Sequence, residues 1–307
     1  MMAATQFYSW RNYRCAYEIQ NFQISQAASA QGNCLPLVLI HPIGVGLSRR
    51  FWDRFCQAWR HQGYGNSLYL PDLLGCGDGD MPAVAYRTED WADQLLFFLQ
   101  TVVNRPSVLV VQGALFPVAI ALAQLEEAQT WVRGLVLSGP PAWSVMTTPT
   151  PHWQTKLLWN LLFEPPVGPL FYRYARRRNF IESFSVRQLF ADAADVDDAW
   201  LAMLDDGAAN PASRYAVFSF LASFWRQDYT ERLAGLNIPT LVTVGDRASS
   251  ISRSGKTETP QDRISEYLKG LPQAEAKLVG GRNVLPYEST TEFVTAIAPF
   301  VHELTDQ

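Results

Sequence analysis

The 307-residue sequence predicts an α/β fold in which helices cover a mostly parallel β-sheet. Three observations lead to this fold class. Short apolar runs such as Val108–Val111 have the length and composition of strands that are buried on both faces. Amphipathic stretches of helical length separate these runs. The chain is 48% hydrophobic and only 18% charged, so it can bury the large core that such a sheet requires.

The predicted elements alternate along the chain. Residues 7–22 are expected to form an antiparallel hairpin, because apolar residues alternate there with more polar neighbours. The later strands are apolar runs bounded by turn residues, and we expect them at 37–40, 66–70, 108–112, 134–138 and 239–245. The helices are expected at 50–61, 89–103, 115–126, 260–270 and 290–303.

Three loops that follow predicted strands resemble motifs of the α/β-hydrolase superfamily. The run Gln112-Gly113-Ala114-Leu115-Phe116 stands where the family has the GxSxG turn between a strand and a helix. His41-Pro42-Ile43-Gly44 is similar to the family's HG oxyanion loop, and residues 71–80 are similar to its D-x-x-G-x-G-x-S-D loop. The resemblance covers about residues 35–145 and 235–303.

This resemblance implies the α/β-hydrolase fold, with a mostly parallel eight-stranded sheet, flanking helices and a helical cap insert. The non-matching segment lies where the family carries its cap. We therefore predict a hydrolase core formed by residues 1–139 and 236–307, and a largely helical cap formed by residues 140–235.

The resemblance also implies where a catalytic triad is expected, because the family orders it as Ser, then Asp or Glu, then His. Aligned on these motifs, Ala114 takes the nucleophile position and Ala248 the acid position. Val284 takes the base position, or Arg282 if the alignment is made on Gly281. None of these side chains performs the corresponding step at neutral pH. A shifted register at the turn, or Asp246 in place of the acid, remains an alternative.

The same turn is expected to form the floor of a pocket. Backbone N–H groups of Leu115 and Ile43 are the candidate oxyanion donors, although Pro42 replaces the usual glycine and Phe116 is larger than the residue that the turn normally tolerates. The predicted pocket residues are His41, Ile43, Gln112, Ala114, Leu115, Phe116, Trp143 and Val284. The cap is rich in aromatic residues, and if some of them line a cleft above Ala114, this pocket suits an apolar ligand. If they face outward, they suit a partner or a membrane surface, and packing of an amphipathic helix on the sheet domain is the alternative for most of them.

Two basic segments are candidates for anion or partner contacts. The cap carries Arg173, Arg176, Arg177 and Arg178 beside aromatic residues, a pattern found on helices that meet an anionic membrane or an acidic partner. A solvated helix face is the alternative. The second segment, residues 246–257, contains Arg247 and Arg253 among serines, and either binds an anion or forms a flexible loop.

Composition excludes several classes of function. A formal net charge of −4 gives no general attraction to nucleic acid. The four histidines and four cysteines show no metal-ligand spacing, and residues 246–257 do not match the phosphate loop of nucleotide-binding proteins, so we expect no metal and no cofactor. The sequence has no signal-peptide pattern and no apolar run of membrane-spanning length. We expect a cytoplasmic protein, with peripheral membrane contact as one option.

These observations predict a catalytically inactive protein of the hydrolase fold, a pseudo-hydrolase, that binds an apolar small molecule or a protein partner. The alternative is an esterase-like or lipase-like hydrolase, or a lyase, that uses chemistry independent of the triad in the same pocket.

Overall fold

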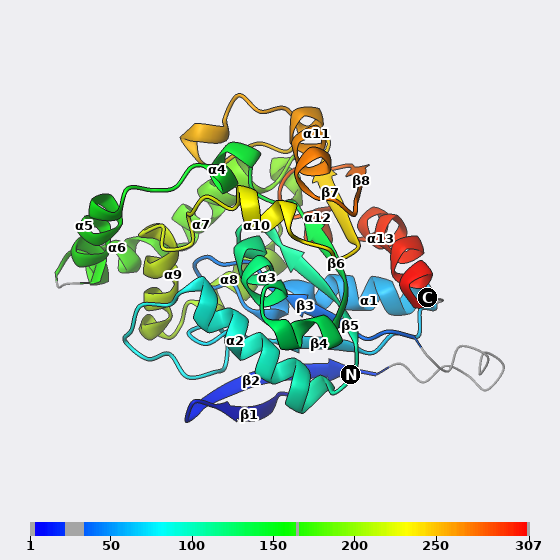
Figure 1. Cartoon of the computed structure of the whole chain (residues 1–307). Coiled ribbons are helices and arrows are strands. Elements are labelled where there is room, and N and C mark those ends of the chain that lie inside the picture. The colour runs from blue at the N-terminus through cyan, green and yellow to red at the C-terminus, as the bar shows by residue number, and fades with distance from the viewer. Residues whose placement is uncertain (1–3, 22–33, 164–165, 306–307) are drawn as a thin grey trace.

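A computed structural model describes residues 4–21, 34–163 and 166–305, and these form one eight-stranded sheet with helices on both faces (Figure 1). The strand order is β1-β2-β4-β3-β5-β6-β7-β8. The strands are β1 (Gln6–Trp10), β2 (Tyr13–Gln20), β3 (Leu37–Ile40), β4 (Leu68–Pro71), β5 (Ser107–Gln112), β6 (Val132–Ser138), β7 (Thr240–Gly245) and β8 (Ala274–Val279). Strand β2 pairs antiparallel with β1 and β4, and all the other pairs are parallel. The predicted α/β-hydrolase fold is therefore confirmed.

The central strands are buried on both faces, which explains their continuous apolar sequences. In β5, Leu109 and Val111 belong to the core on one side of the sheet, while Val108 and Val110 belong to the core on the other side. Strands β3 and β7 divide in the same way. Alternate side chains of a strand point to opposite faces, so a strand covered by helices on both sides must be apolar throughout.

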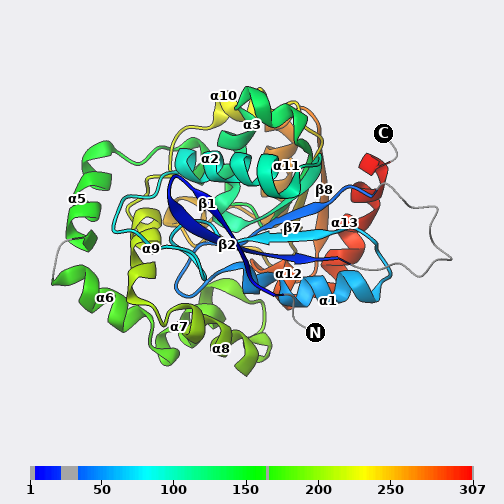
Figure 2. The same cartoon turned by 90° about the horizontal axis from the view of Figure 1, so that it is seen from below.

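Two layers of helices enclose the sheet (Figure 2). One layer contains α2 (Thr88–Phe98), α3 (Phe116–Ala123) and α11 (Pro260–Gly270). The other contains α1 (Asp53–His61), α12 (Leu285–Glu288) and α13 (Thr290–Thr305). Helix α11 begins with a capping box, in which the Thr259 and Asp262 side chains each accept a bond from the other's backbone N–H.

The predicted helices form, with differences at their ends. The segment predicted at 89–103 is α-helical to Phe98 and continues as a single π-helical turn to Val103. It stops at Asn104, which adopts a left-handed backbone conformation. The helix predicted at 115–126 ends at Ala123, and a separate 3₁₀ turn follows at Glu126–Thr130.

The described residues between β6 and β7 fold as helices without a strand. They form α4 (Trp143–Thr147), α5 (His152–Phe163), α6 (Val167–Ala175), α7 (Arg178–Phe184), α8 (Asp198–Gly207), α9 (Arg214–Leu221) and α10 (Thr230–Ala234). We call residues 140–235 the insert. It packs on loops of the sheet domain through bonds such as Tyr86 N–H to Ser219 Oγ (2.9 Å) and Ser144 Oγ–H to the Ser254 carbonyl oxygen (3.0 Å).

Candidate functional site

The turn at the end of β5 connects the centre of the sheet to α3. Gly113 there has φ +62°, in the left-handed region that favours glycine. A Cβ atom built on Gly113 would meet no atom within 4 Å, so the space beyond this residue is open. Ala114 and Leu115 continue the turn as a 3₁₀ segment. The sequence alignment puts the apex of this turn at Ala114, whereas the left-handed residue is Gly113, one position earlier.

Loops that follow β5, β7 and β8 meet beside this turn. The Gln112 side chain donates from Nε2 to the main-chain oxygen of Asn283, with a distance of 2.7 Å. The Asn283 side chain donates from Nδ2 to the main-chain oxygens of Ser249 (2.9 Å) and Gln188 (2.7 Å). Asn283 therefore joins the three loops to one another and to the insert. Asn283 is not among the site residues predicted from the sequence, because the family motifs align only Val284 or Arg282 with the base position.

The three triad positions named from the sequence differ in their surroundings. Ala114 is partly exposed at the turn. Ala248 is buried in the core on the α2–α3 side, and Val284 is buried in the core on the α1–α13 side. The Val284 side chain therefore packs in the core and does not face an open site.

Arg282 and Glu288 hold the loop after β8 in place. The Arg282 guanidinium donates from Nε and Nη2 to Ser249 Oγ, at 2.9 and 2.7 Å. Glu288 accepts from the backbone N–H groups of Arg282 (2.6 Å) and Ala191 (2.9 Å). Burial raises the pKa of the Glu288 carboxyl group and lowers the pKa of the Arg282 guanidinium. Both side chains are engaged in positioning backbone.

His41 is buried, and both of its ring nitrogens have partners. Nε2 accepts from the Leu73 N–H at 3.1 Å, which leaves Nδ1 as the donor to the Pro42 carbonyl oxygen at 2.8 Å. Burial lowers the pKa of the imidazole, which keeps it neutral. His41 thus ties the oxyanion-type loop to the loop after β4, as a structural side chain.

A small cavity lies between the turn and the insert. It is lined by Ala114 and Leu115, by the start of α3, and by side chains of α2, of the segment before α2 and of the insert, among them Tyr86, Trp91, Ser219, Phe220 and Trp225. Its volume is about 10 Å³, which is close to the space needed by a single water molecule. Of the eight pocket residues predicted from the sequence, only Ala114 and Leu115 line it. Among the other lining residues, Phe220 and Trp225 belong to the insert, whose aromatic richness was the sequence signal for them.

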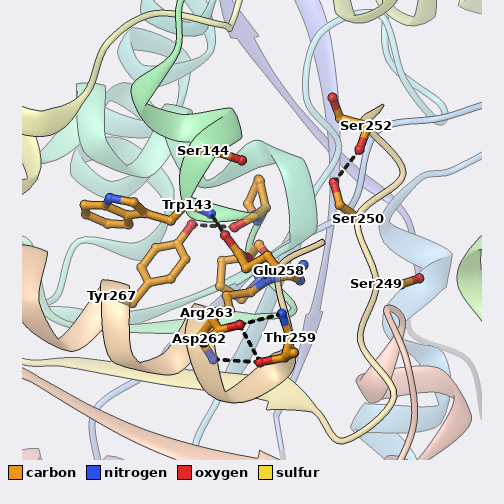
Figure 3. A network of polar contacts seen from close by, with 12 residues as sticks. Trp143, Ser144, Ser249, Ser250, Ser252, Glu258, Thr259, Asp262, Arg263 and Tyr267 are labelled. Carbon is orange, nitrogen blue, oxygen red and sulfur yellow. Dashed lines mark hydrogen bonds and ion pairs between the residues drawn. The ribbon is translucent and has the colours of Figure 1, made fainter. Parts of the chain in front are cut away.

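Trp143 lies at the joint between the insert and α11 instead of in this cavity (Figure 3). Its ring packs edge-on against Tyr267, with centroids 5.2 Å apart, and its backbone N–H donates to Glu258 (2.8 Å). Glu258 also pairs with the buried Arg263 at 2.7 Å. Ile43 and Phe116 are buried core residues, and the Phe116 ring contacts Tyr267 with centroids 6.0 Å apart.

A model of the alpha/beta hydrolase family matches residues 37–296, which is most of the sequence. The chain belongs to the α/β hydrolase family.

Solved structures of similar fold include an esterase from Thermogutta terrifontis, with 18% identity, TM-score 0.71 and coverage of 99% of this chain and 100% of that chain. A bromoperoxidase from Bacillus anthracis has 16% identity and TM-score 0.70, covering 97% of this chain and 100% of the other. An enol-lactonase from Burkholderia xenovorans has 13% identity and TM-score 0.68, with coverage of 97% and 100%. Comparison with curated proteins gave no match. At these identities the likeness concerns the fold.

In the loop formed by residues 246–257 of this α/β hydrolase, several polar side chains bond to other groups of the protein itself. Arg247 pairs with Asp192 at 3.0 Å. Ser252 Oγ lies 2.9 Å from Ser254 Oγ, and Ser250 Oγ–H donates to the Ser252 carbonyl oxygen at 3.0 Å. Arg253 is exposed. The geometry of the loop therefore provides no preformed anion-binding site.

The four arginines of the insert divide into two groups. Arg178 forms an ion pair with Asp198, and Arg176 donates to the Ala209 carbonyl oxygen at 3.4 Å. Arg173 and Arg177 are exposed, and the Arg177 guanidinium lies 5.7 Å from the Tyr174 ring centroid. Within the described residues, polar contacts thus engage Arg176 and Arg178, while Arg177 lies near an aromatic ring.

Two further features are absent from the described residues. These residues contain no group of three or more His, Cys, Asp and Glu side chains arranged to hold a metal ion. None of their helices is both long enough and apolar enough to cross a membrane.

Proposed function

We propose that this α/β hydrolase lacks the serine-hydrolase chemistry of its family and acts by binding. The observation that carries the proposal is Gly113, the left-handed residue at the end of β5. In the family, the sharp turn at this junction exposes the nucleophile. We assign the nucleophile position to Gly113 in place of Ala114. Neither Gly113 nor Ala114 has a side-chain group that can attack a carbonyl carbon.

The contacts around Gln112 support a matching assignment for the other two positions. We assign the base position to Asn283, because its main chain contacts Gln112 and its side chain contacts the residue after Ala248. An asparagine amide has no basic nitrogen, so it cannot take a proton from a nucleophile. Ala248 stays assigned to the acid position and carries no carboxylate.

Other residues do not supply the missing groups. Asp246, the alternative acid, accepts from the Gly281 N–H at 2.9 Å and so supports the loop after β8. His41 is engaged through both ring nitrogens. His61 and His152 lie on exposed helix ends, and His302 packs against Tyr64 with ring centroids 5.1 Å apart.

The proposed bound species is an apolar small molecule or a protein partner. The cavity beside Ala114 has the volume of about one water molecule, so a small molecule enters it only if Phe220 and Trp225 of the insert move aside. A protein partner needs no such movement. Mass spectrometry of small molecules and proteins that co-purify with the chain distinguishes the two.

A second candidate is an enzyme that works without the triad, as an esterase-like hydrolase or a lyase. Membership of the family favours it, and the similar structures include an esterase and a lactonase. The backbone N–H groups at the turn and at Ile43 are its candidate oxyanion donors. Such donors together with substrate binding retain about 10³–10⁴-fold catalysis over water in proteases that lack the triad.

The test combines a fluorophosphonate probe with a panel of p-nitrophenyl esters. The proposal expects neither labelling nor ester turnover above buffer for the purified protein. The variant Gly113→Ser with Ala248→Asp and Asn283→His is the positive control, since it restores all three assigned side chains. Stoichiometric labelling of the unmodified protein would contradict the proposal. Ester turnover without labelling would instead support the second candidate.

A further inference from the structure

Helices α5 and α6 expose most of the large apolar side chains found on the surface of the described residues. Both views place this helix pair at one extremity of the molecule, away from the sheet (Figures 1 and 2). Eight of the fourteen exposed large hydrophobic residues lie on it: Trp153, Leu157, Leu158, Leu161, Val167, Leu170, Phe171 and Tyr174. Apolar residues gathered in this way, in contrast to scattered ones, mark an interaction surface.

These side chains form one stripe on each helix. On α5, Trp153 (66% exposed), Leu157 (59%) and Leu161 (50%) are spaced by four residues and therefore share a face. On α6, Val167, Leu170, Phe171 and Tyr174 follow the spacing i, i+3, i+4, i+7 and also share a face. We call these seven residues together with Leu158 the apolar stripes.

The opposite faces of the two helices are packed, so the stripes are not the result of a missing core. The Trp159 ring contacts Phe224 with centroids 5.1 Å apart, and the Phe163 ring contacts Tyr215 at 5.3 Å. The helices approach closely at Gly168, where a Cβ atom would lie 1.6 Å from the Leu162 carbonyl oxygen. Each helix thus already packs one face against the molecule, where Trp159 and Phe163 of α5 are half-buried and Tyr172 of α6 is buried, and each presents an apolar face outward.

The charged side chains carried by α5 and α6 themselves are all positive. Helix α5 carries Lys156 and no acidic residue, and α6 carries Arg173 and no acidic residue. Lys156 follows Trp153 by three positions, Arg173 follows Leu170 by three, and Arg177 follows Tyr174 by three, so a cation flanks each stripe. This local charge is opposite in sign to the net charge of −4 of the whole chain.

We propose that the α5–α6 helix pair docks the protein on an anionic lipid bilayer. The apolar stripes enter the boundary between headgroups and acyl chains, where tryptophan and tyrosine are favoured. Lys156, Arg173 and Arg177 contact the lipid phosphates or carboxylates from the rim. The inference is independent of the proposed function, because it concerns a surface remote from Gly113.

The composition of the stripes favours a bilayer over a protein partner. Four of the eight residues are leucine, a residue that is under-represented among the side chains that dominate protein interfaces. Apart from the Trp153 indole N–H and the Tyr174 hydroxyl group, the stripes have no polar side-chain group with which to form specific hydrogen bonds to a partner. A lipid surface requires only apolar area and positive charge, and the helix pair supplies both.

The test is co-sedimentation of the full chain with phosphatidylcholine vesicles that contain or lack phosphatidylserine. We expect binding that requires phosphatidylserine and weakens as salt is raised. The variant Lys156→Gln/Arg173→Gln/Arg177→Gln should partition at least about tenfold more weakly at low salt. The variant Leu157→Ser/Leu161→Ser/Leu170→Ser should lose binding at any salt concentration, because it removes apolar area from the stripes.

Matched controls carry the same changes elsewhere on the surface. Arg60→Gln/Arg133→Gln/Arg253→Gln removes three exposed cations, and Ile251→Ser/Leu268→Ser removes two exposed apolar side chains. Adding Leu278→Ser to the second control brings it to three exposed apolar side chains, as in the stripe variant. Both controls should bind like the unmodified protein, and circular dichroism should show that all variants are folded. As an independent measurement, vesicles should shift the tryptophan emission to shorter wavelength, and Trp153→Phe should reduce that shift.

Several outcomes would overturn the proposal. One is equal binding of the unmodified protein and the stripe variant, which would place the contact on another surface. Another is the absence of vesicle binding. If vesicle binding is absent and the chain self-associates in sedimentation experiments unless the stripes are changed, the surface is an interface between two copies of the chain.

Discussion

Gln112 at the end of β5 and Asn283 after β8 are 171 positions apart in the sequence and joined by a hydrogen bond of 2.7 Å. Gln112 immediately precedes the left-handed Gly113, and Asn283 also contacts the loop after β7 through its side chain. These two contacts of Asn283 bring the loop after β8 to the end of β5 and to the loop after β7. Together with the left-handed conformation of Gly113, they are the basis on which Gly113 and Asn283 are proposed for the nucleophile and base positions.

The assignment of Gly113 is tested by comparing two serine variants in a background of Ala248→Asp and Asn283→His. Gly113→Ser should react with a fluorophosphonate at least about ten times faster than Ala114→Ser, because only the first has the supplied base beside its hydroxyl group. Ala114→Ser alone should stay inactive. Faster labelling of the Ala114→Ser protein would instead support the alignment predicted from the sequence, in which residue 114 takes the nucleophile position.

The same substitution has an expected cost in stability. A serine at Gly113 must adopt the left-handed conformation, which costs about 1–2 kcal/mol, although no neighbouring atom obstructs its Cβ. Differential scanning calorimetry of Gly113→Ser and Gly113→Ala should show equal decreases in melting temperature. A loss for serine alone would mean that its hydroxyl group, and not the backbone, is the cause.

The bond between Gln112 and Asn283 predicts a local effect on stability. Gln112→Leu keeps most of the side-chain volume but leaves the part-buried carbonyl oxygen of Asn283 without this donor. The free energy of unfolding should fall by about 1 kcal/mol, as expected for the loss of one hydrogen bond. Urea denaturation measures the change, and an unchanged midpoint would show that the three loops are aligned by other contacts.

The buried ion pairs of Arg49 predict a larger effect on the free energy of unfolding. Its guanidinium is buried and pairs with the buried Asp72, with Glu18 (2.9 Å) and with Asp78 (2.7 Å). Arg49→Met leaves a buried carboxylate unpaired, and the free energy of unfolding should fall by about 3–5 kcal/mol. The neighbouring Arg50 pairs with Asp206 at the exposed surface, so Arg50→Met should change stability by less than about 1 kcal/mol. Similar losses for the two variants would contradict the role of burial.

Asp53 predicts a dependence of stability on pH. Burial, with a further contribution from the nearby Glu18 carboxylate, raises the pKa of Asp53 to about 6. Because the folded pKa lies above the unfolded value, the contribution of Asp53 to stability is fully present below about pH 4 and is lost as the pH rises through 6.

Asp53→Asn, which cannot ionise, should therefore be more stable than the unmodified protein above pH 7 by on the order of 2 kcal/mol. The two proteins should converge near pH 4. Urea denaturation across this pH range measures the difference, with Asp205→Asn as a control at an exposed carboxylate of α8. A stability difference that is constant with pH would exclude the raised pKa as its cause.

The elements of the fold were predictable from the sequence because the signals for them are local. The apolar runs at β3, β5 and β7 reflect burial on both faces, and amphipathic spacing marked α1, α11 and α13. Helix ends were less predictable. The helix expected to reach residue 126 ends at Ala123, for example, because a helix end depends on backbone conformations that many sequences can adopt.

The sequence by itself determined the family and the alternation of strands and helices as far as β7, since motifs spread over most of the chain agree on them. It did not predict β8, because this strand is only partly buried and its sequence is not a continuous apolar run. Tertiary structure alone decided which residues stand at the candidate site. Whether Gly113 or Ala114 forms the apex depends on one backbone angle, and whether Arg282, Asn283 or Val284 faces β5 depends on contacts across 171 positions. The tertiary structure also decided that Trp143 faces Tyr267 and that the apolar stripes face outward. Elements that are distant in the sequence determine which face of a helix is covered.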